Sequence, residues 1–131
     1  MSSCVLHVCG EDFDVDAFLA QSTLRPYQVH HRGESRFSRR DSDSGFSLTV
    51  SDADGDLAAQ VADAIRLLEE WEPELQRLRV FRGVEDLRLD FGYYRRDDVF
   101  VQGEYLPPRL LALAGRCEIG IALSLYPTPT A

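Results

Sequence analysis

The apolar residues between Asp56 and Leu78 recur at intervals of three and four, a spacing that predicts one long amphipathic helix. Asp54 or Asp56 suits its first turn, because a carboxylate there accepts hydrogen bonds from free backbone N–H groups. Pro73 lacks a backbone N–H, so the helix either bends at this residue or ends and restarts with proline in its first turn. Such a helix needs an apolar surface beside it, which limits the fold to a few layered arrangements.

Strand patterns supply that surface. Residues 4–9 are apolar on both alternating faces, as expected of a central strand, whereas residues 45–52 and 86–94 alternate apolar with polar side chains and should bury one face each. Residues 98–105 are expected to be the hairpin partner of 86–94. Residues 27–31 and 118–126 complete the predicted strands.

Two shorter helices are predicted, one after Asp14 that ends before Pro26, and one over residues 107–115 that begins with prolines and ends at Gly115. The order is therefore β-α-β-β-α-β-β-α-β in a single α+β domain over residues 1–131. We expect a mostly antiparallel or mixed sheet with helices on one face, a ferredoxin-like variant in its first six elements.

The net charge of −8 disfavours nucleic acid and anionic lipid as partners. All 14 basic residues are arginine, and the chain contains neither lysine nor asparagine, which is typical of a GC-rich genome. An arginine cluster therefore carries less functional weight here than in a chain that also uses lysine. No apolar run approaches the roughly 18 residues of a membrane span, and the N-terminus lacks the pattern of a secretory signal, so we expect a cytoplasmic protein without a membrane partner.

Residues 30–45 form the segment with the most local positive charge. Its flanking acidic residues cancel much of that charge, and its polar composition predicts a mobile strand-to-strand loop over residues 33–44. If the loop has a role, we expect it to contact a protein partner rather than nucleic acid. The candidate residues for that contact are Arg32, Arg36, Phe37, Arg39 and Arg40.

Catalytic signatures are missing from the sequence. Six cysteine and histidine residues could in principle ligate zinc, but none has the C-x2-C spacing, so we interpret them as packing residues and predict no metal and no cofactor. The alternating aspartates near Gly55 lack the order of a calcium loop. No triad spacing is present, and we assign no catalytic residue. An alternative small-molecule or enzyme site would lie on the polar face of the sheet, at Arg88, Asp90, Tyr94, Ser124 and Tyr126.

Two blocks of the chain carry a family resemblance. CVLHVCGEDFDVDAFLAQSTLRPYQVHHRGE at residues 4–34 and PPRLLALAGRCEIGIALSLYP at residues 107–127 resemble a bacterial family catalogued as domain of unknown function 4279. The resemblance implies a compact bacterial domain and supplies no catalytic residues. Together with the acidic charge, it leads us to expect a binding or interaction module, of an immunity or accessory type, that acts on an unidentified protein partner. A homodimer that forms through the outer sheet face or a sheet edge is a further expectation, since two-fold dimers are common among oligomers.

Overall fold

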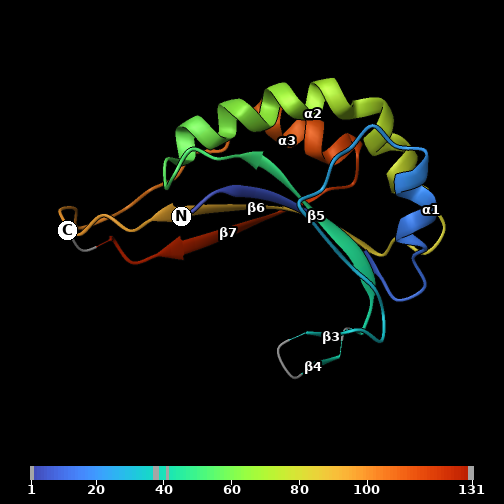
Figure 1. Cartoon of the computed structure of the whole chain (residues 1–131). Coiled ribbons are helices and arrows are strands. Elements are labelled where there is room, and N and C mark those ends of the chain that lie inside the picture. Colours follow the sequence, from blue (N-terminus) through green and yellow to red (C-terminus); the bar gives the residue numbers. More distant parts are fainter. Residues whose placement is uncertain (1, 37–38, 41, 130–131) are drawn as a thin grey trace.

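The computed structural model describes residues 2–36, 39–40 and 42–129, and Figure 1 shows their arrangement in layers. The helices are α1 (Val15–Ala20), α2 (Leu57–Arg79) and α3 (Pro108–Arg116). The main sheet has five strands in the order β2-β5-β1-β6-β7, which are β2 (Gln28–His30), β5 (Ser44–Ser51), β1 (Cys4–Gly10), β6 (Asp86–Tyr94) and β7 (Gly120–Tyr126). Strands β3 (Ser35–Arg36) and β4 (Arg39–Arg40) form a separate ribbon. The α+β prediction is confirmed.

The sheet is mixed. β1 pairs antiparallel with β5 and β6, β2 pairs antiparallel with β5, and β7 runs parallel to β6. The parallel pair needs a crossover connection, which α3 provides. In Figure 1, α2 and α3 lie across one face of the sheet, and the β3–β4 ribbon hangs below the opposite face. The assignment to a ferredoxin-like variant stays a prediction.

The strand alternation seen in the sequence directs the apolar residues to the helix layer. In β1, Leu6 and Val8 are buried on that side, whereas His7 and Cys9 are partly buried on the other. β6 follows the same rule, with Leu89 buried beneath the helices. The alternation predicted for β6 and the central place predicted for β1 are therefore confirmed, and the apolar core lies between the sheet and α2.

α2 runs without interruption through Pro73. The side chain of Asp56 accepts a hydrogen bond from the backbone N–H of Ala59 at 3.1 Å and caps the first turn. Pro73 is exposed, and Leu75 and Leu78 beyond it are fully buried. The helix therefore neither ends nor restarts at the proline.

One sequence prediction was wrong, and one short element was not predicted. Residues 98–105, all of them described, form no strand, because both edges of β6 are already occupied by β1 and β7. Residues 33–44 were expected to be a mobile strand-to-strand loop, and its mobility stays a prediction. Among those of its residues that the structure describes, Ser35 pairs with Arg40, and Arg36 pairs with Arg39, in the β3–β4 ribbon, which the sequence did not predict. In both cases the available backbone partners decided the outcome, and these are not visible in a local pattern.

A buried glutamine ties the sheet to the first turn of α2. Gln60 has no exposed surface, and its Nε2 donates to the carbonyl oxygens of Gly92 at 2.7 Å, Ala53 at 2.8 Å and Ser2 at 3.3 Å. The N-terminal segment is held further because the backbone N–H of Ser2 donates to Asp54 at 2.7 Å. One amide thus joins three segments that are distant in the chain.

We predict that Gln60→Met lowers the free energy of unfolding by about 2 kcal/mol, because the substitution keeps the side-chain volume but leaves buried carbonyls without a donor. Urea unfolding monitored by circular dichroism measures this change. Gln21→Met is the matched control, since Gln21 is exposed, and it should be nearly neutral. Equal stabilities for the two variants would contradict the role assigned to Gln60.

Candidate functional site

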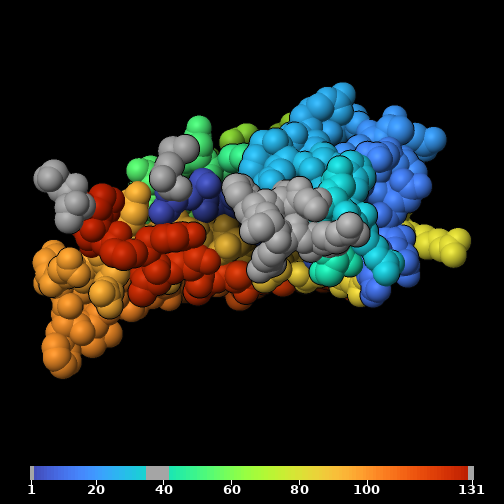
Figure 2. Space-filling view, turned by 60° about the horizontal axis from the view of Figure 1, so that its bottom comes forward, coloured from blue at the N-terminus to red at the C-terminus, as the bar shows by residue number. Residues whose placement is uncertain are grey.

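The face of the sheet opposite α2 and α3 carries no helix within the described residues, and Figure 2 views the molecule from that side. We call it the open face. Its residues come from alternate positions of four strands and are mostly small or polar. They are Val5, His7, Cys9, Ser47, Thr49, Arg88, Asp90, Ala122 and Ser124.

Two adjoining hollows mark the end of this face at which β1 leads into α1. The first has a volume of about 260 Å³ and is lined by His7, Val8, Cys9, His30, Asp43, Phe46, Ser47, Arg88 and Asp90. The second, of about 350 Å³, is lined by Cys9, Gly10, Glu11, Ser42, Asp43, Glu85 and Asp86. Because Cys9 and Asp43 belong to both, we treat the two hollows as one feature, the open-face site.

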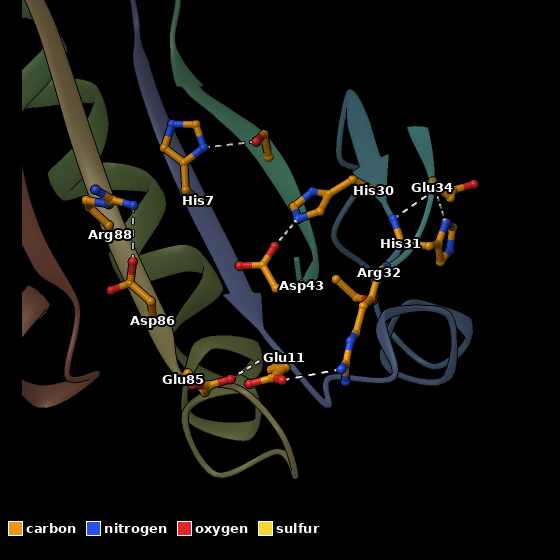
Figure 3. A network of polar contacts seen from close by, with 12 residues as sticks. His7, Glu11, His30, His31, Arg32, Glu34, Asp43, Glu85, Asp86 and Arg88 are labelled. Carbon is orange, nitrogen blue, oxygen red and sulfur yellow. Dashed lines mark hydrogen bonds and ion pairs between the residues drawn. The ribbon is translucent and has the colours of Figure 1, made fainter. Parts of the chain in front are cut away.

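The polar side chains of the open-face site are paired with one another (Figure 3). Nδ1 of His7 lies 2.9 Å from Oγ of Ser47, and Nε2 of His30 lies 2.9 Å from Oδ1 of Asp43. The Arg88 guanidinium contacts Asp86 at 3.2 Å. These contacts hold the side chains in place.

Negative charge predominates in the open-face site. Among the residues that the structure describes, its lining contains the carboxylates of Glu11, Asp43, Glu85, Asp86 and Asp90 and the guanidinium of Arg88. At the rim, Arg32 approaches Glu11 and Asp12, each at 3.4 Å. An excess of carboxylates on an open surface attracts cationic groups.

Two titratable groups of the open-face site have shifted pKa values. Partial burial lowers the pKa of the His7 imidazole below its ordinary value, and Arg88 lowers it further against the opposing effect of Asp90. Burial, reinforced by Asp43, raises the pKa of the Cys9 thiol to about 11. A thiol with such a pKa is almost fully protonated near pH 7, and therefore a poor nucleophile.

The structure places His7, Cys9 and His30 around the first hollow and the other possible zinc ligands elsewhere. Cys4 is buried on the helix side of β1, whereas His7 faces the open side. His31 instead contacts Asp16 and Glu34, each at 2.9 Å. Within the described residues, no group of three or more histidine, cysteine, aspartate or glutamate side chains is placed to hold a metal ion.

Of the five sheet-face residues singled out in the sequence, Arg88, Asp90 and Ser124 lie on the open face. Oγ of Ser124 donates to Asp90 at 2.7 Å, one strand away from the first hollow, which Asp90 and Arg88 both line. Tyr94 and Tyr126 are register partners at the far end of β6 and β7. The Tyr94 hydroxyl donates to Asp54 at 2.7 Å, so it takes part in holding the N-terminal segment.

The arginine-rich segment contributes differently. Arg32 forms ion pairs with acidic residues of its own chain, at the rim of the open-face site. Arg36, Arg39 and Arg40 belong to the β3–β4 ribbon, and Phe37 lies outside the described residues. Sequence reasoning missed the pairing of His30 with Asp43, because no local pattern indicates that these two residues meet.

Comparisons with known proteins add one finding. A family model described as domain of unknown function (DUF4279) matches residues 1–128. Neither the curated proteins nor the solved structures gave a match. None of the described helices combines the length and apolar character needed to cross a bilayer.

We predict that His7 makes the protein less stable in mild acid. Its pKa is lower in the folded than in the unfolded state, so the unfolded chain binds more protons, and stability falls as the pH drops below about 6.5, the ordinary histidine pKa. The loss of melting temperature between pH 7.5 and pH 5.5 should therefore be smaller in His7→Gln than in the wild type.

His31→Gln is the control for this measurement. The adjacent carboxylates of Asp16 and Glu34 raise the pKa of His31, so its contribution to stability is present in mild acid and is lost as the pH rises through the folded pKa. Its replacement should change the acid dependence in the opposite direction. A wild-type acid dependence that His7→Gln leaves unchanged would show that His7 is not the responsible group.

Proposed function

We propose that this chain, which belongs to the DUF4279 family, is a partner-binding protein that presents the open face of its sheet to a basic surface of another protein. The observation that carries the proposal is the acidic lining of the open-face site on a face that no described helix covers. Binding there would occlude the partner's basic residues. An immunity-type or accessory protein of the cytoplasm would act in this way.

Charge supports a basic partner at two ranges of distance. The net charge of −8 attracts a cationic surface during diffusional encounter. At contact, the two hollows are wide and open enough to admit the end of a lysine or arginine side chain. Among the described side chains, Asp86 makes polar contacts only with Arg88 and Asp90 only with Ser124, so both carboxylates keep oxygen lone pairs for such a cation. The hydrogen bonds of His7 to Ser47 and of His30 to Asp43 hold the surrounding side chains in one arrangement, which reduces the entropy lost on binding.

The chemistry of the site also supports binding over catalysis. The most accessible thiol, Cys9, has a raised pKa, and among the described residues the hydrogen bonds join His7 to Ser47 but to no carboxylate. A serine with a histidine alone lacks the third group that orients the imidazole in a catalytic triad. Recognition by complementary charge requires none of these features.

The test removes two charges from the site and compares affinity. Tagged wild type should retain a basic protein from the native host in stoichiometric amounts, and Asp86→Asn/Asp90→Asn should bind that purified protein at least tenfold more weakly, about 1.4 kcal/mol. The wild-type affinity should also fall with increasing salt. Titration calorimetry of the purified pair measures both effects.

Glu69→Gln/Glu70→Gln is the matched control, because it removes the same charge from α2 on the other side of the sheet and should bind like the wild type. If no stoichiometric partner is recovered, or if the two double variants bind equally well, the proposal fails.

A small ligand is a second candidate, favoured by the size of the first hollow and by the histidines and thiol in its lining. Its volume of about 260 Å³ is slightly below the usual range of ligand pockets, so a compact molecule is required. The acidic lining favours an amine. A melting-temperature screen of small amines and organic acids tests this candidate, because a ligand at a hundred times its Kd stabilises the folded state by about 2.7 kcal/mol. Stabilisation that disappears in Asp43→Asn would support it, and a screen without stabilising compounds would remove it.

A further inference from the structure

The outer edge of β7 is a strand edge without the usual protection. Among the described strands, β7 pairs only with β6, so one side of its seven-residue backbone has no strand beside it. Natural proteins guard such edges with charged residues, proline, bulges or very short strands. The sequence from Ile119 to the C-terminus contains no charged residue, and its first proline follows the strand at Pro127.

The opposite edge of the same sheet is guarded. β2 has only three residues, and the chain beyond it continues through the ion-paired His31 and Arg32 into the β3–β4 ribbon. A second strand could add few hydrogen bonds there. An added strand would therefore form more backbone hydrogen bonds at the edge of β7 than at the edge of β2.

Apolar side chains along β7 are left half in solvent. Leu123 is 47% exposed, Leu125 is 52% exposed and Tyr126 is 47% exposed. The two leucines share the helix side of the sheet with their register partners Phe91 and Tyr93, which are buried. Burying the outer side of these leucines would stabilise any complex that covered them.

The backbone hydrogen bonds show which residues of β7 face outward. The carbonyl of Tyr126 accepts from the backbone N–H of Arg95 at 2.9 Å, so the polar backbone groups of Tyr126 point toward β6. Because these groups alternate in direction along a strand, those of Ile121, Leu123 and Leu125 point to the outer edge.

We propose that β7 pairs antiparallel with β7 of a second copy of this chain, with the two-fold axis at Leu123. In this register Leu123 exchanges backbone hydrogen bonds with the partner's Leu123, and Ile121 does so with the partner's Leu125. Gly120 lies opposite the partner's Tyr126, so the aromatic ring meets a residue without a side chain. The strand is therefore complementary to itself, as a two-fold interface requires.

The absence of charged side chains from β7 allows a second copy to bind there. Two chains that each carry −8 repel one another, and an interface between them is least costly where neither contributes a charged side chain. The uncharged sequence of β7 provides such a place. An axis perpendicular to the sheet also puts both helix layers on one side and both open faces on the other, so the pair would present two copies of the open-face site in one direction. The dimer itself does not depend on the function proposed for that site.

Light scattering after gel filtration at micromolar concentration tests the proposal. The wild type should have twice the 14.8 kDa mass of one chain, and Leu123→Arg, which places two guanidinium groups together at the axis, should have the mass of a monomer. Tyr27→Arg is the matched control, because Tyr27 is 59% exposed and precedes β2 at the opposite edge of the sheet, and this variant should remain dimeric. A monomeric wild type, or a Leu123→Arg variant that stays dimeric, would overturn the proposal.

A cross-link decides the question even if Leu123→Arg does not fold. Residues opposed in a hydrogen-bonded antiparallel pair have Cα atoms about 5.5 Å apart, within the range of a disulfide. Leu123→Cys should therefore form a covalent dimer on mild oxidation, whereas Tyr27→Cys and the wild type, with its own thiols, should not. Failure of Leu123→Cys to cross-link more than these two controls would count against the two-fold axis at this residue.

Discussion

Burial of one sheet face beneath α2 is the constraint from which the other features follow. α2 places Leu68, Leu75 and Leu78 against the sheet, and all three side chains are essentially buried. The strands must then direct their apolar residues to that side, which leaves the other side for residues that tolerate water. In this protein those residues include histidines, hydroxyls and carboxylates. The one-sided helix layer therefore accounts for the open face and for its polar character.

Local patterns predicted the parts of the fold that depend on a single segment. The apolar period of α2 and the alternation of β5 and β6 identified these elements and their buried faces, because each pattern records which side of the element is covered. β1, apolar on both faces, was identified as a central strand without a buried face being assigned. Residues 98–105 have a strand-like alternation too, but β6 had no free edge left for them. The parallel pairing of β7 through α3 takes that edge, and no residue within 98–105 indicates it.

The candidate site shows the same limit. Arg88, Asp90 and Ser124 could be assigned to one face from strand alternation, and the structure joins Asp90 to Ser124 across two neighbouring strands. His30 and Asp43, in contrast, come from segments that meet only because β2 lies beside β5. The acidic lining of the site is assembled from several such segments. In the sequence these acidic residues are dispersed among arginines, which hide the local excess of negative charge.

The two proposed surfaces differ in the physical interaction that would hold their partners. The open-face site is rich in carboxylates, so its attraction to a basic protein rests on charge and weakens as salt screens it. The edge of β7 carries no charge, and two copies of an acidic chain approach one another more easily when salt screens their mutual repulsion. Backbone hydrogen bonds and leucine burial, which salt screens little, would then hold the edge pair. Because β7 contributes only its outer backbone and its exposed leucines to that pair, a dimer would leave the hollows between β1, β5 and β6 accessible to a basic partner.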